Sequence, residues 1–229
     1  MGTMMLCLSN MLDIDLRAQL AVLLAAADFA DGAGTAGWHA RLVKTNRQAV
    51  LRHPATRQAA ALVSAALRDH PVFRAAVQPR RIAPPLFARY ATGEAYGPHV
   101  DDALMGLADP AGPLRSDVAV TVFLAAPESY DGGDLIIEDS SGEQAFKLAA
   151  GDAIAYPATS LHRVAPVTAG ERQVAVTWVQ SLVRDAAKRE ILFDLDTARQ
   201  HLFAKEGKSA TFDLLAKSHA NLLRRWAEP

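Results

Sequence analysis

Residues 151–181 read GDAIAYPATSLHRVAPVTAGERQVAVTWVQS. Short apolar stretches alternate here with Gly, Pro, Thr and Ser, and the last stretch places Val174, Val176 and Trp178 at every second position. Because alternate side chains share one face of a strand, the pattern indicates short β-strands joined by turns. The segment therefore predicts a β-rich core and argues against a parallel α/β sheet.

The same pattern continues upstream as far as Arg81. Turn residues stand at Asp131-Gly132-Gly133, Ser141-Gly142, Gly151-Asp152 and Ala169-Gly170. Short strands at this spacing are typical of a sandwich or jelly roll. We expect strands at Leu86–Tyr90, Val118–Leu124, Leu135–Glu138, Gln144–Leu148, Ala153–Tyr156, His162–Val164 and Arg172–Val179.

Helical patterns flank this core. Asp13 is a candidate N-cap, a second helix is expected over Ala55–Arg68, and His39–Val43 between them reads as a short strand. Helices return beyond Arg184, and both flanks are expected to pack on the β core. The predicted fold is α+β, divided into an N-terminal helical flank (1–80), a jelly-roll core (81–182) and a C-terminal helical extension (183–229). The apolar helix positions are Leu16, Leu20, Leu23 and Leu24 near the start, and Phe212, Leu215, Leu222 and Trp226 near the end.

Composition limits the kinds of partner. The 229 residues include 24 Lys and Arg against 25 Asp and Glu, a net charge of -1. This balance argues against the broad positive surface that binding to nucleic acid or an anionic membrane needs. The longest apolar run, Leu20 to Ala27, is shorter than the ~18 residues of a membrane-spanning helix. The single cysteine, Cys7, rules out an intramolecular disulfide, so we expect a cytoplasmic protein.

A metal site is indicated by His99-Val100-Asp101 and by His162. On a strand, His99 and Asp101 would point to the same face. The pair alone is a weak signal, but it follows a Gly-bearing turn after an apolar strand, and His162 opens another predicted strand. Two His and one carboxylate on one face of a metal leave three adjacent positions open, the arrangement of non-haem Fe(II) oxygenases.

Arg172 lies ten residues beyond His162, at the start of the last predicted core strand. A buried guanidinium there offers a planar pair of donors to a carboxylate. We therefore expect Arg172 to bind a small acid. We expect structural roles for the other polar residues near these motifs. Asp134 should lie in a turn, Asp102 should be exposed to solvent, and Tyr96 and Tyr156 should pack in the core.

Several motifs together resemble one family. They read YATGEAYGPHVD (90–101), YDGGDL (130–135), GDAIAYP (151–157), LHRVAPV (161–167) and GER (170–172). The chain resembles the Fe(II)- and 2-oxoglutarate-dependent dioxygenases of the prolyl 4-hydroxylase type, and more narrowly the PKHD-type, or iron-uptake-factor, hydroxylases. The similarity continues through WVQS (178–181) into the C-terminal helices, whereas the first seven residues look unlike the family.

The resemblance implies a double-stranded β-helix in which His99, Asp101 and His162 bind Fe(II) and Arg172 binds the distal carboxylate of 2-oxoglutarate. It places Tyr90 and Trp178 in the co-substrate pocket and implies L-ascorbate as a reductant. Where some relatives carry a second tyrosine anchor, this sequence has Phe123. Thr121, on the same predicted strand face, is the candidate substitute.

Two alternatives remain open from the residues alone. One is a non-catalytic jelly-roll protein that binds a metal or ligand. The other is a zinc hydrolase using the same three ligands, although that reaction gives Arg172 no role and no Glu general base is evident near the ligands. The co-substrates implied are 2-oxoglutarate and O₂, while the prime substrate stays open among a small molecule, a siderophore and a peptide. The C-terminal helices leave a homo-oligomer possible, and the family resemblance suggests a link to iron homeostasis.

Overall fold

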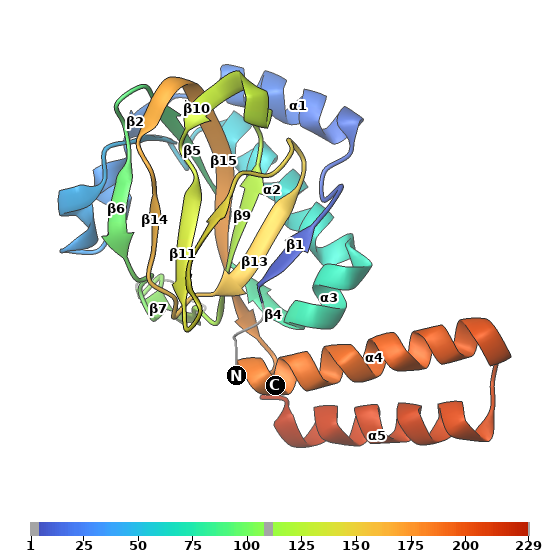
Figure 1. Ribbon diagram of the computed structural model, residues 1–229. Helices are drawn as coiled ribbons and strands as arrows, with labels where there is room; N and C mark the ends of the chain where they lie inside the picture. Colours follow the sequence, from blue (N-terminus) through green and yellow to red (C-terminus); the bar gives the residue numbers. More distant parts are fainter. Residues whose placement is uncertain (1–4, 108–111, 229) are drawn as a thin grey trace.

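A computed structural model describes residues 5–107 and 112–228. Two antiparallel β-sheets face each other, three helices cover the outer face of the larger sheet, and a helical hairpin extends from one end (Figure 1). The predicted α+β fold with a jelly-roll core is therefore confirmed. Within the described residues, no helix is both long and apolar enough to cross a membrane.

The larger sheet has the order β1-β13-β9-β15-β5-β3-β2, and β4 and β10 pair with β15 in addition. Its longest strand, β15, lies between β9 and β5 and carries Arg172. The strands span Leu6–Leu8 (β1), Phe29–Asp31 (β2), Arg47–Ala49 (β3), Pro79–Ile82 (β4), Leu86–Ala91 (β5), Val118–Phe123 (β9), Tyr130–Gly132 (β10), Ala153–Pro157 (β13) and Val167–Ser181 (β15).

The smaller sheet has the order β12-β11-β14-β6, and a separate two-stranded ribbon, β7–β8, lies beside it. In this sheet His162 of β14 stands directly opposite His99 of β6. The strands span Tyr96–His99 (β6), Leu135–Asp139 (β11), Gly142–Phe146 (β12) and His162–Val164 (β14), with Leu104–Met105 (β7) and Leu114–Arg115 (β8) in the ribbon.

Alternation along the strands of the larger sheet builds two apolar cores. In the C-terminal half of β15, Ala175 and Val179 face the helices, whereas Val174 faces the smaller sheet. The second core joins both sheets through Leu135 and Ile137 of β11. Burying one face of the sheet against helices and the other against a second sheet removes both from water, which stabilises the layers.

The helices span Ile14–Ala25 (α1), Pro54–Asp69 (α2), Pro71–Val77 (α3), Ala186–Glu206 (α4) and Ala210–Trp226 (α5). The predicted cap of the first helix is confirmed, because the Asp13 carboxylate accepts a hydrogen bond of 2.8 Å from the Leu16 amide. Leu20 and Leu24 of α1 are buried in the core that also contains Val63 and Phe73 of the next two helices. The N-terminal helices therefore pack on the sheet as expected.

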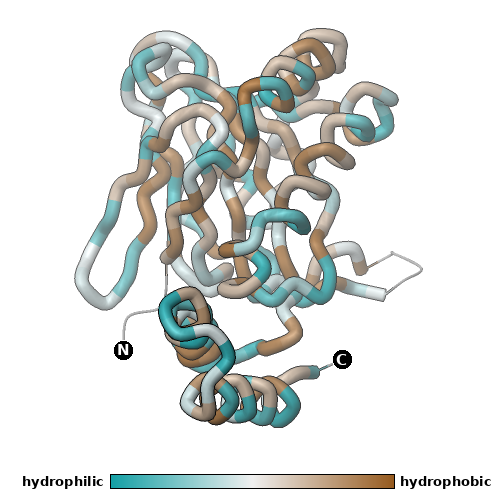
Figure 2. The backbone as a smooth tube through the Cα atoms, turned by 90° about the vertical axis from the view of Figure 1, so that its right-hand side faces the viewer, coloured by the Kyte–Doolittle hydropathy of each residue, from teal (hydrophilic) through white to brown (hydrophobic). Residues whose placement is uncertain are grey.

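The apolar positions of the last helix, which include Phe212, do not pack on the β core as predicted. Phe212 of α5 lies against Phe203 of α4, with ring centroids 5.1 Å apart, so α5 packs mainly on α4 and not on the β core. Figure 2 shows this hairpin standing apart from the sheets, with α4 nearer to them. The amphipathic pattern of α5 requires an apolar surface to pack on, and the neighbouring helix α4 provides that surface.

Two local predictions were wrong. Residues Ala40–Val43 form a 3-10 helix instead of a strand, because Arg41 N–H and Leu42 N–H donate to the carbonyls of Gly37 and His39 just before the segment. The predicted turn at Ala169-Gly170 lies inside continuous β15, where Gly170 has a φ of 73° and pairs with Tyr130, and the β10–β15 register shifts nearby at Thr168. The N-terminal flank also contributes β1, β2 and β3 to the larger sheet, so the first seven residues lie partly in a strand (residues 1–4 are outside the described part).

Candidate metal centre and co-substrate cavity

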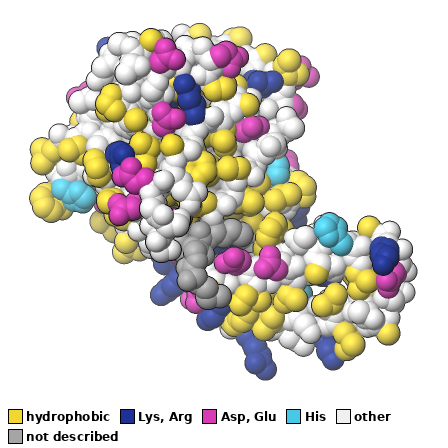
Figure 3. All heavy atoms as spheres, in the orientation of Figure 1, with side chains coloured by type: hydrophobic (Ala, Val, Ile, Leu, Met, Phe, Trp, Pro, Cys, Tyr) yellow, Lys and Arg dark blue, Asp and Glu magenta, His cyan; other side chains and the backbone are white. Residues whose placement is uncertain are grey.

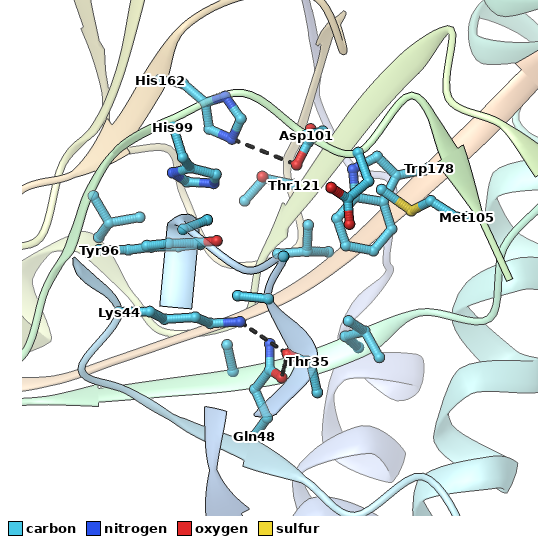
Figure 4. A pocket seen from close by; sticks show the side chains of 18 of the residues that line it. Thr35, Lys44, Gln48, Tyr96, His99, Asp101, Met105, Thr121, His162 and Trp178 are labelled. Carbon is cyan, nitrogen blue, oxygen red and sulfur yellow. Dashed lines mark hydrogen bonds and ion pairs between the residues drawn. The ribbon is translucent and has the colours of Figure 1, made fainter. Parts of the chain in front are cut away.

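The pairing of β14 with β6 brings His162 and His99 together, and Asp101 follows two residues after β6 ends. Asp101 thus lies in a loop beyond the predicted strand, yet it still reaches the same point. One ligand atom from each of the three residues lies within 4.8 Å of the others, and His162 Nε2 is 3.9 Å from Asp101 Oδ1 (Figure 4). The three predicted ligands therefore converge from distant parts of the chain.

Backbone carbonyls orient both imidazoles. His99 Nδ1 lies 2.9 Å from the Gly97 carbonyl oxygen, and His162 Nδ1 lies 3.0 Å from that of Ser160. Since a carbonyl can only accept, Nδ1 carries the hydrogen in each ring and Nε2 keeps a free lone pair. A hydrogen bond of this kind at the far nitrogen is the usual support of a metal-binding histidine.

Burial sets the protonation states in the centre. Desolvation, helped by the nearby His162, lowers the pKa of His99 to about 3, so its ring is neutral at physiological pH. Desolvation also raises the pKa of the Asp101 carboxyl, an effect that His162 opposes. The buried Asp101 Oδ2 has no hydrogen-bond partner. Two imidazoles oriented by backbone carbonyls and an unsatisfied carboxylate oxygen fit a divalent transition metal such as Fe(II).

Arg172 lies deeper between the sheets and is 1% exposed. Its guanidinium carbon is 5.1 Å from the Tyr90 ring centroid and 5.7 Å from that of Phe123, and its Nε has no hydrogen-bond partner. Desolvation lowers the pKa of Arg172, but a guanidinium stays protonated at neutral pH. Arg172 is therefore a buried cation without a carboxylate partner among the described residues, a fit for an anionic group of 2-oxoglutarate.

One cavity of about 450 Å³ contains both the metal ligands and Arg172. Tyr90, Thr121 and Trp178 line it as well, so all seven predicted site residues meet in one space. Its volume is in the range of small-molecule sites. The acidic side chains among its described lining residues are Asp101 and Asp102, and no Glu is present to act as the base of a hydrolase.

Known proteins match this chain along most of its length. Residues 85–180 match the 2OG-Fe(II) oxygenase superfamily, and residues 186–228 match the PKHD-type hydroxylase C-terminal domain. The PKHD-type hydroxylase of Acaryochloris marina is 53% identical over 98% of this chain and all of the relative; that of Crocosphaera subtropica is 49% identical with the same coverage. The chain belongs to the PKHD-type hydroxylases.

Membership gives the activity class. As a PKHD-type hydroxylase, the protein is a 2-oxoglutarate-dependent non-haem iron oxidoreductase, with Fe(II) and 2-oxoglutarate as cofactors and O₂ as co-substrate. The resemblance noted in its motifs is therefore confirmed. The readings as a non-catalytic binding protein or a zinc hydrolase are not supported.

Solved structures share the fold at low identity. A viral collagen prolyl hydroxylase from Paramecium bursaria Chlorella virus-1 superposes with a TM-score of 0.53 at 20% identity, covering 77% of this chain and 96% of the other. A prolyl hydroxylase from Trichoplax adhaerens superposes with a TM-score of 0.58 at 15% identity, covering 83% and 87%. These likenesses support the jelly-roll fold of the PKHD-type hydroxylase.

The structure adds residues that the sequence analysis missed. Tyr96, expected to be a core aromatic, stacks on His99 with ring centroids 3.6 Å apart, so it supports a metal ligand of the PKHD-type centre. The buried Tyr130 hydroxyl lies close to the Arg172 guanidinium. Lys44 and Gln48 line the cavity from the N-terminal flank. Asp102, by contrast, is exposed as expected.

Proposed function

We propose that His99, Asp101 and His162 bind the Fe(II) of this PKHD-type hydroxylase. The observation that carries the proposal is the convergence of their ligand atoms within 4.8 Å at one end of a cavity. Fe(II) and 2-oxoglutarate bound there supply the oxidative decarboxylation of 2-oxoglutarate by O₂ and the hydroxylation of a substrate C–H bond. The three side chains hold the metal from one side and leave the cavity side open.

Arg172 is proposed to bind the distal carboxylate of 2-oxoglutarate. Its burial, its unsatisfied Nε and its place in the same cavity as the metal ligands support this role. Gly133 leaves room for the arginine, because a Cβ at this glycine would lie 3.1 Å from Arg172 Cδ. A charge-assisted pair of this type contributes about 1.5–3 kcal/mol, enough to select an acid over a neutral analogue.

Tyr90, Thr121 and Trp178 are proposed to form the walls around the co-substrate. Tyr90 lies opposite Arg172 in the β5–β15 register, and Thr121 stands opposite Val176 between β9 and β15. Thr121 supplies a hydroxyl, which Phe123 cannot. The walls exclude water and hold the acid between the metal and the guanidinium, which keeps the reacting groups in a fixed geometry.

The test is metal- and co-substrate-dependent turnover. Purified protein, stripped of metal and reconstituted under anaerobic conditions, should retain one Fe(II) per chain after desalting and should bind 2-oxoglutarate. On exposure to O₂ it should release succinate. Zinc or no metal should give no succinate. Protein that holds Fe(II) but neither binds nor consumes 2-oxoglutarate would overturn the proposal.

Finer expectations rest on the family resemblance. We propose that L-ascorbate re-reduces the iron after turnovers that are uncoupled from substrate, which predicts that ascorbate prolongs linear succinate release. A siderophore, another small molecule or a peptide is the expected substrate class, with a link to iron homeostasis in the cytoplasm. Loss of the gene should then impair growth under iron limitation.

A homo-oligomer through the C-terminal helices is also proposed. Figure 3 shows apolar side chains along the hairpin, and those of Phe203 and Leu214 are 52% and 59% exposed. Sedimentation of the intact chain and of a variant with Asp at both positions tests this proposal. Equal monomeric masses for the two would reject it.

A further inference from the structure

A buried lysine shares the cavity with the metal ligands. Lys44 is 7% exposed and follows the 3-10 helix Ala40–Val43. A β-bridge between Lys44 and Tyr96 sets the lysine beside the tyrosine, and Lys44 Nζ lies 5.0 Å from the centroid of the Tyr96 ring. Because the same ring stacks on His99, one tyrosine separates the ammonium from a metal ligand (Figure 4).

Two side chains orient the ammonium. Lys44 Nζ donates a hydrogen bond of 2.9 Å to Thr35 Oγ1, and Thr35 Oγ1 in turn contacts Gln48 Oε1. Since Oε1 faces Thr35, the Gln48 amide nitrogen is the end of the group directed toward the cavity (Figure 4). Gln48 is 8% exposed and donates no hydrogen bond to another described residue. We call Thr35, Lys44 and Gln48 the lysine cluster.

The lysine cluster has no counterion. No carboxylate lies within 4.0 Å of Lys44 Nζ in the described part of the chain, although Asp31 and Asp101 act on it from farther away. Desolvation lowers the pKa of Lys44 to about 8, which leaves the amine mostly protonated at neutral pH. Burying a charge without an ion partner costs stability, so such a group is expected at a ligand site.

We propose that the lysine cluster binds a carboxylate of the prime substrate and thereby directs the substrate toward the metal centre. This inference rests on the proposed function of the triad. One ammonium and one amide N–H donor match the two oxygens of a carboxylate, whereas a phosphate is more commonly held by several cations or a helix N-terminus. The co-substrate carboxylate has its own proposed partner in Arg172, whose guanidinium lies beside the rings of Tyr90 and Phe123, whereas Lys44 lies beside Tyr96.

The surroundings of the cluster define the rest of the substrate. The same cavity is also lined by apolar side chains from separate parts of the chain, among them Leu51, Leu86, Leu104 and Met105. Apolar walls with a few polar groups are typical of sites that orient a small ligand. The expected substrate is therefore an acid with a short apolar portion, as a free small molecule or at the end of a peptide.

The test uses a matched pair of probes, hexanoate and hexanamide. The protein is loaded with Mn(II) in place of Fe(II) and saturated with 2-oxoglutarate. Because 2-oxoglutarate then occupies Arg172, the lysine cluster is the site in the cavity that remains open to an anion. Proton NMR of each probe then reports binding, and line broadening by Mn(II) reports proximity to the metal. We expect hexanoate to bind at least about tenfold more tightly than hexanamide, with broadening that disappears in D101A protein, which holds no Mn(II).

Two cavity variants and one control variant test whether the preference for hexanoate arises from the lysine cluster. K44M should remove the preference for hexanoate, whereas K217M, which removes an exposed lysine of α5, should keep it. Q48E should also remove the preference, because the new carboxylate pairs with Lys44 and repels the probe. Hexanamide binding should change little in either cavity variant.

The remaining outcomes would reject either this inference or the proposed function. Equal binding of both probes, an unchanged preference in K44M, or tighter binding of pentylphosphonate than of hexanoate would overturn the inference while leaving the iron site intact. Loss of 2-oxoglutarate binding in K44M would overturn it too, because the cluster would then belong to the co-substrate site. Failure of the parent chain to retain Mn(II) and 2-oxoglutarate would instead reject the proposed function.

Discussion

The cavity has two polar ends that are built in different ways. At the metal end, His99 and His162 come from paired strands, and backbone carbonyls hold both rings. At the lysine end, Thr35 ends the 3-10 helix Gly32–Thr35, Lys44 follows the 3-10 helix Ala40–Val43, and Gln48 lies in the short strand β3 of the N-terminal flank. Sheet strands hold atoms at fixed positions, whereas loop and edge segments are freer to vary between proteins. We therefore expect the sheets to hold the iron chemistry that the family shares, and the N-terminal flank to select the substrate.

Both ends contain buried polar atoms without partners. Asp101 Oδ2 and Arg172 Nε lack hydrogen bonds at the metal end, and Lys44 lacks a counterion at the other. Unsatisfied buried groups reduce stability, so each of them indicates where a bound group would be favourable. The predictions below separate the contributions of the two ends.

The largest effect is expected from D101A. Loss of the carboxylate should abolish Fe(II) retention and reduce succinate release by at least about 10³-fold. The fold should survive, because burial raises the pKa of this carboxyl and its removal relieves an unfavourable desolvation. Metal analysis and thermal unfolding of the metal-free protein check both parts. Full iron occupancy in D101A would contradict the ligand assignment.

Replacing Arg172 should affect the co-substrate and spare the metal. We expect R172A to raise the KM for 2-oxoglutarate by about 10- to 150-fold, the equivalent of one charge-assisted interaction. Iron stoichiometry should stay at one per chain. R172K keeps the charge without the planar pair of donors, so its KM should be intermediate. A KM in R172A equal to that of the parent would remove Arg172 from the site.

The Tyr96 ring lies between the two ends, on His99 and beside Lys44. Y96L should weaken Fe(II) binding by about 10- to 100-fold, as expected when the support of a metal ligand is lost. Y96F keeps the ring and serves as the matched control, with iron affinity close to that of the parent. Competition with a chromogenic chelator measures both. Equal affinities in Y96L and the parent would show that the stack does not position His99.

At the lysine end, K44M should increase the free energy of unfolding by about 1–3 kcal/mol at pH 7. Folding lowers the pKa of Lys44 from 10.5 to about 8, so the folded state disfavours the protonated form. This penalty is fully present below pH 8 and declines as the pH rises toward 10.5. Urea unfolding of K44M and parent should therefore show a gap that narrows between pH 7 and pH 9.5. A destabilised K44M would indicate a structural role.

The smallest effect is expected far from the cavity. F212A removes the contact with Phe203 in the helical hairpin and should cost about 1 kcal/mol of stability. Succinate release should be unchanged, because α5 contributes no residue to the cavity lining. Reduced 2-oxoglutarate turnover in F212A would show that the hairpin communicates with the sheets.

The metal end could be predicted from the sequence because its chemistry needs particular residue types at readable places. His99 and Asp101 are separated by one residue, and His162 and Arg172 each begin a strand predicted from the turn residues before it. The lysine end could not be predicted. Lys44, Asn46 and Gln48 alternate in a polar stretch that reads as a solvated loop, yet all three are buried.

Local patterns along the chain were enough to predict most strand-forming segments, the Asp13 cap, the candidate ligand types and the family. Alternation and turn residues act locally, so they are readable without contacts. Only the tertiary structure decided that Ala40–Val43 turns into a 3-10 helix, that α5 packs on α4, and that Lys44 faces the metal cavity. These outcomes depend on which surfaces meet, and burial of a polar side chain is a property of the whole fold.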